Sequence, residues 1–248
     1  MKTYRYLGIL GGLGPMSTVY FCELLNRHTL ATCDADHIDM LISSRATTPD
    51  RTSYILDKDA TDPLPVMLAD AHRLERAGVD LLVMPCNTAH YFYDGLAQKC
   101  QTPILNIIDE TTAHLSRIGV KTFGLLATEG TIRSGAYERF CTSRNLTCIT
   151  PTEKEQSTIT NIIFERIKQN KPVDMSAFNN VIDSLRQRGC EKIVLGCTEL
   201  SLLKKQGLDE NLFIDSLDVL AYQTILACGK TPIGFPTSFD STEVRNEG

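Results

Sequence analysis

The sequence is short of three things that would point to large classes of function: long apolar runs, an excess of basic residues and paired cysteine motifs. None of its apolar stretches approaches the roughly 18 residues that a membrane-spanning helix needs. Its 25 lysines and arginines are outnumbered by 30 aspartates and glutamates, which gives a formal net charge of -5. A chain without a basic excess has no electrostatic footprint for nucleic acid or for an anionic membrane. We therefore expect no nucleic-acid or membrane partner, and a small molecule as the ligand.

The first residues also lack the features of an export signal. Residues 1–6 run directly into a strand-like segment, without the apolar core and cleavage site of a signal peptide. We therefore expect a cytoplasmic protein in a reducing compartment, where disulfides do not form. None of the nine cysteines belongs to a Cys-x-x-Cys pair or has a histidine at ligand spacing, so the sequence predicts no metal site. Most of the cysteines should be small buried hydrophobic residues.

Short aliphatic runs alternate with helical stretches along the chain. Strands are expected at residues 6–10, 38–43, 80–84 and 104–107, and helices at residues 16–29 and 64–77. The pattern restarts where residues 123–127 repeat the character of residues 7–11, at an offset of 116 positions. Helices at 157–168 and 177–188 and a strand at 192–195 follow. Such alternation predicts mostly parallel sheets with right-handed crossovers.

The repeat predicts an α/β protein of two similar Rossmann-like halves, with the active site in the cleft between them. The first half covers residues 1–115 and the second covers residues 116–215. A last helix at 216–228 should pack back onto the first half. Residues 229–248 are expected to form a polar, poorly ordered tail. The alternative is a chance match, because strands that end in glycine are common in α/β folds.

Cys86 and Cys197 lie in matching settings, 111 residues apart. In each case an apolar run of strand length ends, a cysteine follows, and a threonine comes within two positions. A thiol at the end of a buried strand points into the cleft beyond the sheet, so two such thiols can face each other across one cleft. That arrangement suits the removal of a proton from one face of a carbon and its return to the other. The alternative for each cysteine is a buried structural thiol.

The residues around the two cysteines suggest how a thiol could be activated. Asn87 and Thr88 can cap the next helix, and a helix start lowers the pKa of a cysteine placed there. Thr198 and Glu199 repeat the arrangement after the second cysteine. The loop at residues 11–15 fails as a nucleotide loop, because no Gly-Lys-Ser/Thr follows it, but its backbone N–H groups could hold a carboxylate.

Five segments resemble motifs of the aspartate/glutamate racemase superfamily, and of its aspartate racemase branch in particular. They are Gly8-Ile-Leu-Gly-Gly-Leu-Gly-Pro15, Pro49-Asp-Arg-Thr52, Met84-Pro-Cys-Asn-Thr-Ala-His90, Leu125-Leu-Ala-Thr-Glu-Gly-Thr131 and Leu195-Gly-Cys-Thr-Glu-Leu200. The resemblance covers residues 5–215 in order. It implies racemisation of a small acidic amino acid without pyridoxal phosphate or another cofactor, by a homodimer with one catalytic cysteine on each side of Cα.

The resemblance also implies the site residues. Cys86 and Cys197 are the catalytic pair, Arg51 grips a substrate carboxylate in bidentate fashion, and Lys168 meets the distal carboxylate. Glu199 stands where glutamate racemases of the cell-wall type carry histidine, which favours the aspartate or broad-specificity branch. His90 is expected to be structural. The substrate-binding candidates are Gly12, Met16, Arg51, Asn87, Thr88, Thr128, Thr131, Lys168, Thr198 and Glu199.

The predicted function is therefore the interconversion of L- and D-aspartate, with glutamate as a second candidate substrate. The two differ by one methylene, worth about 1–3 kcal/mol of discrimination, so the sequence leaves both open. Two other classes also stay open. One is a hydantoin racemase or a relative of maleate isomerase or malonate decarboxylase, and the other is a non-catalytic amino-acid-binding protein. Which cysteine serves which enantiomer is not assigned.

Overall fold

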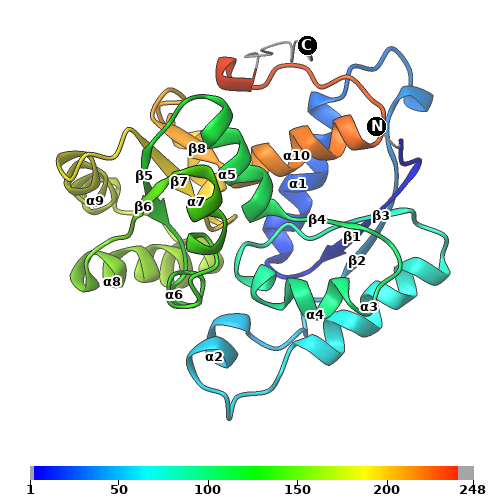
Figure 1. Cartoon of the computed structure of the whole chain (residues 1–248), viewed down its shortest axis with the longest axis horizontal. Coiled ribbons are helices and arrows are strands. Elements are labelled where there is room, and N and C mark those ends of the chain that lie inside the picture. Colours follow the sequence, from blue (N-terminus) through cyan, green and yellow to red (C-terminus); the bar gives the residue numbers. More distant parts are fainter. Residues whose placement is uncertain (1–2, 240–248) are drawn as a thin grey trace.

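The computed structural model describes residues 3–239, which form two α/β halves side by side (Figure 1). Each half contains a four-stranded sheet in which every strand pair is parallel. The first sheet has the order β2-β1-β3-β4 and the second the order β6-β5-β7-β8, so the two halves share one topology. The predicted α/β class with two similar Rossmann-like halves is thus confirmed.

The strands of the first sheet are β1 (Tyr6–Gly11), β2 (Asp39–Ser44), β3 (Leu81–Val83) and β4 (Ile104–Leu105). Those of the second sheet are β5 (Thr122–Leu126), β6 (Thr147–Ile149), β7 (Lys192–Leu195) and β8 (Phe213–Asp215). Leu7 of β1 lies opposite Leu81 of β3, and Leu125 of β5 lies opposite Val194 of β7. The four central strands β1, β3, β5 and β7 are buried on both faces, and their sequences are therefore mostly apolar.

Ten α-helices of the described chain connect or cover the strands. They are α1 (Pro15–His28), α2 (Arg51–Leu56), α3 (Leu64–Arg76), α4 (Tyr93–Ala97), α5 (Ile107–Arg117), α6 (Glu129–Arg133), α7 (Glu138–Arg144), α8 (Glu153–Asn161), α9 (Met175–Gln187) and α10 (Ser216–Ala227). Helical segments of the 3-10 or π type lie at Asp34–Asp36, Thr88–Phe92, Ile162–Arg166, Ile167–Gln169, Leu200–Gln206 and Thr237–Phe239. Among residues 3–239, the helices are too short or too polar to cross a membrane.

Two predicted elements differ from those observed. The strand expected at 104–107 ends after Leu105, because the side chain of Asn106 accepts hydrogen bonds from the N–H groups of Ile108 and Asp109 and so caps α5. The helix expected at 157–168 begins earlier, as α8, and then widens into a π-helical turn at Ile162–Arg166. This turn shifts the direction of the side chains that follow it.

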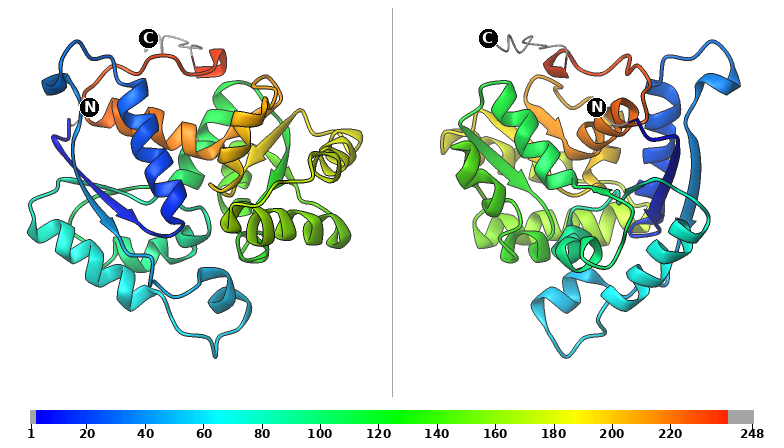
Figure 2. Two further views of the ribbon diagram at one scale, coloured as in Figure 1. Left: turned by 180° about the vertical axis from the view of Figure 1, so that it is seen from behind. Right: turned by 45° about the vertical axis from the view of Figure 1, so that its right-hand side comes forward.

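The last helix and the segment after it join the halves. The helix α10 packs against α1 and α5 of the first half and, as Figure 2 shows, crosses close to α1. The largest group of buried apolar side chains also combines Leu7, Leu125 and Leu217, from β1, β5 and α10. One continuous core therefore fixes the two sheets relative to each other.

The expectation of a poorly ordered tail is wrong for residues 229–239. This segment pairs with the first half through a bridge between Thr29 and Pro232. Its Phe239 is 6% exposed and stacks on His114 with ring centroids 4.3 Å apart. The segment is polar on average, which is why it was expected to be poorly ordered. It nevertheless contains Phe235 and Phe239, whose rings contact each other and supply apolar area that can be buried. Residues 240–248 lie outside the described part of the chain.

Candidate active site

A narrow cavity opens between the two halves, at the carboxyl ends of the strands. It encloses about 320 Å³ of empty space, counted to its mouth. Cys86 lies three residues beyond the end of β3, and Cys197 lies two residues beyond the end of β7. Because β3 and β7 hold the same position in their sheets, the two halves deliver one thiol each to the same cavity. The lining residues are Leu13, Asp50, Arg51, Thr52, Cys86, Asn87, Thr88, Thr128, Phe164, Lys168, Cys197, Thr198 and Glu199.

Most of the residues predicted for the site line this cavity, but three do not. The side chain of Met16 is 54% exposed at the start of α1. Gly12 has its N–H bonded to Thr18 Oγ1 at 2.9 Å, so that N–H is not free for a carboxylate. The geometry therefore does not support substrate binding by Met16, nor anion binding by the N–H group of Gly12. Thr131 lies just behind the lining, in contact with Thr128.

The surroundings of Cys86 differ from the predicted helix start. The segment after it is a five-residue 3-10 helix, Thr88–Phe92, and the side chain of Asn87 makes no capping bond. Burial raises the pKa of the Cys86 thiol, and the charge of Arg51 offsets part of that rise. A hydrogen bond from the backbone N–H of Ala89 acts in the same direction as Arg51. The expected lowering of the pKa by a helix start is thus wrong, since burial outweighs it.

Cys197 has a carboxylate as its immediate neighbour. Its thiol donates a hydrogen bond to Oε2 of Glu199 at 3.0 Å. Burial and the negative charge of Glu199 raise the pKa of Cys197 well above its ordinary value, and Lys168 acts in the opposite direction. The protonated thiol is therefore the stable form of Cys197 in this arrangement.

Arg51 is a buried cation held by backbone carbonyls. It is 9% exposed at the first position of α2. Its Nη1 donates to the carbonyl of Pro49 at 3.1 Å, and its Nη2 donates to that of Leu13 at 2.9 Å. Among residues 3–239, its buried Nε has no hydrogen-bond partner. With a weaker bond from Nη1 to the carbonyl of Thr48 at 3.4 Å, three of the five N–H groups are engaged within the protein, so Nε and one N–H of Nη2 remain for an anionic ligand.

Lys168 and Glu199 form an ion pair inside the cavity, with Lys168 Nζ bonded to Oε1 of the carboxylate. Burial lowers the pKa of Lys168, but Glu199 more than offsets this, so that the pKa is raised and the ammonium is retained. The lysine predicted to meet a ligand carboxylate therefore meets one of the protein's own in this structure. Its Nζ also lies 5.5 Å from the ring centre of Phe164, which belongs to the π-helical turn.

Three threonine hydroxyls form a triangle across the two halves. Thr88 Oγ1 lies 2.9 Å from both Thr128 Oγ1 and Thr131 Oγ1, and the latter two are 3.0 Å apart. Thr128 also caps α6, because its side chain accepts from the N–H of Thr131. The triangle places polar hydrogen-bonding groups from both halves beside the cavity.

Asn87 and Thr198 tie the two cysteine loops to the opposite half. Asn87 Nδ2 donates to Ser216 Oγ at 2.9 Å, and Tyr137 Oη donates to Asn87 Oδ1 at 2.8 Å. Thr198 Oγ1 donates to the carbonyl of Pro85 at 3.4 Å. Although both residues line the cavity, the polar groups of the Asn87 side chain are already engaged within the protein.

The sequence analysis missed four lining residues. Asp50 and Thr52 flank the predicted arginine, and Leu13 lies within the glycine-rich loop, so each was adjacent to a recognised motif. Asp50 caps α2, because its side chain accepts from the N–H of Ser53 at 2.7 Å. Phe164 offered no sequence signal, since only the π-helical turn directs it to the cavity.

His90 makes two hydrogen bonds that hold the loop of Cys86 in place. Its Nδ1 donates to the carbonyl of Cys86 at 2.8 Å, and its Nε2 accepts from the N–H of Ile107 at 3.2 Å. Burial lowers its pKa to about 4. The ring is therefore neutral, and it holds the Cys86 loop on the start of α5, in agreement with its expected structural role.

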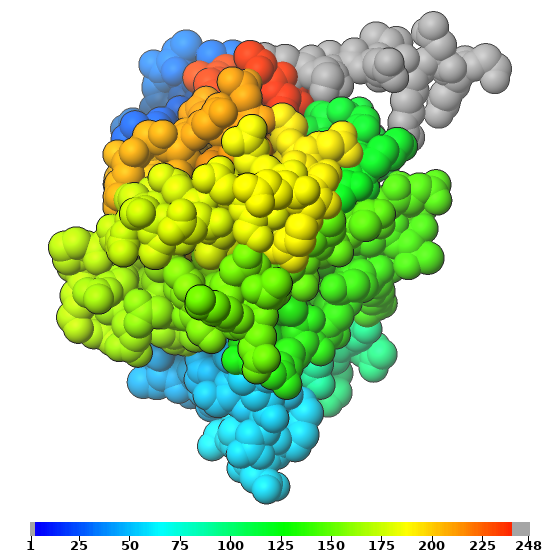
Figure 3. Space-filling model, turned by 90° about the vertical axis from the view of Figure 1, so that its left-hand side faces the viewer, coloured from blue at the N-terminus to red at the C-terminus, as the bar shows by residue number. Residues whose placement is uncertain are grey.

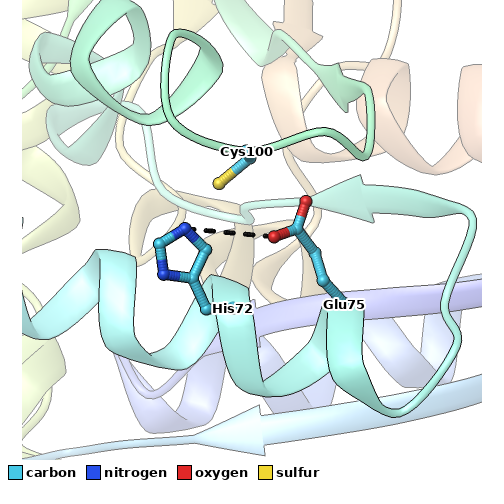
Figure 4. A group of neighbouring side chains, drawn as sticks. All are labelled: His72, Glu75 and Cys100. Atoms are coloured by element: carbon cyan, nitrogen blue, oxygen red, sulfur yellow. Dashed lines mark ion pairs between the residues drawn. The ribbon is translucent and has the colours of Figure 1, made fainter.

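One group with the chemistry of metal ligands lies away from the cavity. His72, Glu75 and Cys100 offer ligand atoms that all lie within 4.8 Å of one another (Figure 4). Sequence spacing did not indicate this group, because Cys100 is 28 positions from His72. Hydrogen bonds explain the group: Glu75 Oε1 accepts from the N–H groups of Gln101 and Thr102, at 2.7 and 2.8 Å. The cluster therefore clamps this loop onto α3.

Comparison with known proteins gives the family of the chain. A broad-specificity amino-acid racemase of Bacillus subtilis (strain 168) is 28% identical over 228 residues, covering 88% of this chain and 96% of the relative. The aspartate racemase of Picrophilus torridus has a TM-score of 0.82 at 28% identity, over 95% of this chain and 98% of that one. A glutamate racemase of Francisella tularensis subsp. tularensis, solved with D-glutamate, shares the fold with a TM-score of 0.60 at 17% identity, over 90% of this chain and 81% of that one. Residues 10–224 match the model of the Asp/Glu/hydantoin racemase family, and the chain belongs to that family.

Proposed function

We propose that this protein is an amino-acid racemase that interconverts L- and D-aspartate without pyridoxal phosphate, with Cys86 and Cys197 as its two acid–base groups. The observation that carries the proposal is the cavity itself. Equivalent strands of two similar halves deliver one thiol each to its lining, together with a buried arginine. A racemase needs this arrangement, because it must remove a proton from one face of Cα and supply one to the opposite face.

Arg51 is proposed to bind the α-carboxylate of the substrate. Its guanidinium is held in place by the carbonyls of Pro49 and Leu13, so little side-chain entropy is lost when a ligand binds. A cation beside the carboxylate also stabilises the negative charge that develops when Cα loses its proton. Each unit of pKa difference between Cα–H and the thiol costs about 1.36 kcal/mol, so this field is essential in the absence of an electron-accepting cofactor.

The thiolates are proposed to be stabilised by backbone N–H groups. Ala89 donates to the sulfur of Cys86, and Glu199 donates through its backbone to that of Cys197. The threonine triangle beside the cavity supplies hydroxyls for the substrate ammonium or carboxylate. These groups are fixed before substrate arrives, which is the condition for electrostatic catalysis.

Lys168 is proposed to recognise the side-chain carboxylate of aspartate or glutamate. To do so it must exchange its present partner, Glu199, for the substrate. If Lys168 stays paired, only Arg51 remains for carboxylate binding, and amino acids with neutral side chains would be accepted as well. A broad-specificity racemase is therefore the second candidate, which also agrees with the name of the Bacillus subtilis relative.

The proposal is tested by incubating the purified, reduced protein with single enantiomers of aspartate, glutamate and alanine, without pyridoxal phosphate, and separating the products on a chiral column. We expect D-aspartate from L-aspartate, and the reverse, with both Cys86→Ala and Cys197→Ala inactive. Cys190→Ala is the matched control, because Cys190 and Cys86 are both 7% exposed and Cys190 belongs to the core of the second half. Racemisation of alanine as fast as aspartate would support broad specificity instead.

Protein that is folded and reduced but racemises none of the three amino acids would contradict the proposal. Hydantoins and maleate would then be tested as substrates, and binding of amino acids would be measured without turnover. A homodimer and a cytoplasmic location are further proposals, based on the family resemblance. Sedimentation of the purified protein and fractionation of its native cells test them.

A further inference from the structure

The two thiols of the cavity have different neighbours. The thiol of Cys197 donates to Oε2 of Glu199 at 3.0 Å, whereas the charge that acts most strongly on Cys86 is that of Arg51. A carboxylate beside a thiol favours its protonated form, and a guanidinium favours the thiolate. Burial and the charge of Glu199 raise the pKa of both thiols, and Lys168 lowers both. The difference is that Arg51 offsets part of the rise at Cys86, whereas at Cys197 the hydrogen bond to Glu199 adds to it.

Glu199 is held in place on three sides. Lys168 binds its Oε1 and Cys197 binds its Oε2, and its side chain is 9% exposed. Gly14 packs against the same carboxylate so closely that a Cβ atom there would lie 2.6 Å from Oε1. A carboxylate fixed in this way cannot turn away from Cys197 without breaking its ion pair.

We propose that Glu199 is a positioning residue that holds Cys197 protonated, so that Cys86 is the thiol that ionises first and begins the reaction as thiolate, and Cys197 is the first proton donor. This inference rests on the proposed racemase function and adds to it. The family resemblance treats the two cysteines as equivalent partners, whereas the contacts of Glu199, Lys168 and Arg51 make them unequal before substrate binds.

The proton balance of the first turnover follows from this assignment. The Cys86 thiolate takes the proton from Cα and leaves a carbanion there. The S–H of Cys197 then gives its proton to the opposite face of Cα, so one S–H bond forms and one breaks. The cavity then holds a Cys86 thiol and a Cys197 thiolate beside the Glu199 carboxylate. The resting state returns when a proton passes from Cys86 to Cys197 through water or through the ammonium of the product.

The assignment has a kinetic signature. Because L- and D-aspartate have equal free energies, kcat/KM must be equal in the two directions for every variant. The values of kcat can still differ, since one enantiomer meets the resting thiols directly and the other must wait for a proton to be exchanged between them. We therefore expect unequal kcat values in the wild type and a ratio closer to one in Glu199→Gln.

The decisive experiment measures the thiols without turnover. Cys86→Ser and Cys197→Ser each leave one cavity thiol, and its alkylation by iodoacetamide is followed at fixed pH by mass spectrometry of the peptide that carries it. We expect Cys86 to react faster than Cys197. Adding Glu199→Gln should then accelerate alkylation of Cys197 about tenfold, as a fall of one pKa unit gives, and Lys168→Met should slow it. Glu199→Asp, which retains the charge, should keep the slow reaction.

Glu23→Gln is the control for loss of a carboxylate, because Glu23 pairs with Arg27 on the surface of α1. Thermal unfolding of each variant shows whether it remains folded. Equal or slower alkylation of Cys197 in folded Glu199→Gln protein would overturn the inference, and so would a Cys197 that reacts faster than Cys86. Because no turnover is required, this result stands apart from the racemase assay. A protein that fails as a racemase can still pass this test, and an active racemase can fail it.

Discussion

At the scale of single residues, Arg51 is the group that most clearly prepares the cavity for an anion. A buried charge is costly unless it is bonded, and here backbone carbonyls rather than a carboxylate supply the bonds. Within the described part of the chain, no acidic side chain is bonded to it, so its positive charge is not cancelled in that way. A ligand carboxylate is the natural partner, because guanidinium and carboxylate match in both charge and shape.

Replacing Arg51 by lysine tests this interpretation. Lysine keeps the charge but lacks the planar set of donors that bonds three carbonyls at once. We expect kcat/KM for aspartate to fall about 100-fold, which corresponds to about 2.7 kcal/mol. Steady-state kinetics checks this, with Arg139→Lys as the control, because Arg139 is 62% exposed in a surface ion pair. An activity within a few-fold of the wild type would show that Arg51 does not grip the substrate in bidentate fashion.

His90 makes stability depend on pH. Its pKa is about 4 in the folded protein, against 6.5 when unperturbed, so the unfolded chain binds more protons between these values. The contribution of His90 to the free energy of unfolding should therefore be fully present above pH 6.5. It should be lost as the pH falls toward 4, a loss of about 3 kcal/mol. His114, whose pKa is also lowered to about 4, acts in the same direction. Urea unfolding at several pH values should give a shallower pH dependence for His90→Gln, and identical slopes would contradict this account.

At the scale of secondary structure, the contact between α2 and α6 positions Arg51 over the second half. Figure 3 shows the segment that contains α2, in light blue, projecting beneath the green and yellow second half. The contact depends on Gly130 of α6, since a Cβ there would lie 3.0 Å from the Cα of Thr52. The glycine thus allows backbone to approach backbone, next to the residue proposed to bind substrate.

Gly130→Ala should push α2 away from α6. The backbone of Thr52 cannot turn aside as a flexible side chain can, so we expect KM for aspartate to rise severalfold and stability to fall by about 1–3 kcal/mol. Gly95→Ala in α4 is the matched control, because the nearest atom there, also at 3.0 Å, is the end of the Leu64 side chain. The measurements are KM and urea unfolding. An unchanged KM in Gly130→Ala would mean that the α2–α6 contact does not position Arg51.

Elements with strong local signals were predictable, and those that depend on distant contacts were not. The helix α3 begins at Leu64 as expected, and β1 and β7 occupy their predicted places. The strands β6 (Thr147–Ile149) and β8 (Phe213–Asp215) were not predicted, because each includes a polar residue and neither forms an unbroken apolar run. The π-helical turn at Ile162–Arg166 has no sequence signature, so the directions of Phe164 and Lys168 could not be derived from helical periodicity.

The C-terminal segment is a structural element in its own right. Phe239 packs on His114, Tyr222 and Phe235, and so covers α10 and α5. Phe239→Ala should reduce stability by about 3–5 kcal/mol, the usual cost of emptying a buried aromatic site. Tyr91→Ala is a suitable control, because Tyr91 is 41% exposed. Equal unfolding midpoints for the two variants would show that the segment contributes little to the fold.

At the scale of the whole molecule, the cavity exists only because the two halves are held together. The helix α10 carries Ser216, which bonds both Asn87 of the first cysteine loop and the carbonyl of Leu195 at the end of β7. One residue thus connects the loops of both thiols. This arrangement explains why a helix late in the sequence packs on the first half, where it was expected.

The sequence allowed the family and the two cavity thiols to be predicted. Each cysteine motif directly follows a strand, and the similarity between the two halves indicated that both thiols belong to one cavity. The resemblance to the racemase superfamily is confirmed by the family match. The pairing of Lys168 with Glu199 was not predictable, because it joins segments 31 positions apart through an irregular helix. Nor could the raised pKa of the thiols be foreseen, since burial is its largest cause at both cysteines, and Glu199 adds to it at Cys197 only because its side chain folds back onto the sulfur.

The central claim is that two thiols act on opposite faces of one carbon. The most direct test is proton NMR of the protein with L-aspartate in deuterated water, without pyridoxal phosphate, for the wild type and for Cys86→Ala and Cys197→Ala. We predict that the Cα proton signal disappears as D-aspartate accumulates in the wild type, and that neither variant forms D-aspartate. D-aspartate formation that continues in either variant would contradict the two-thiol mechanism.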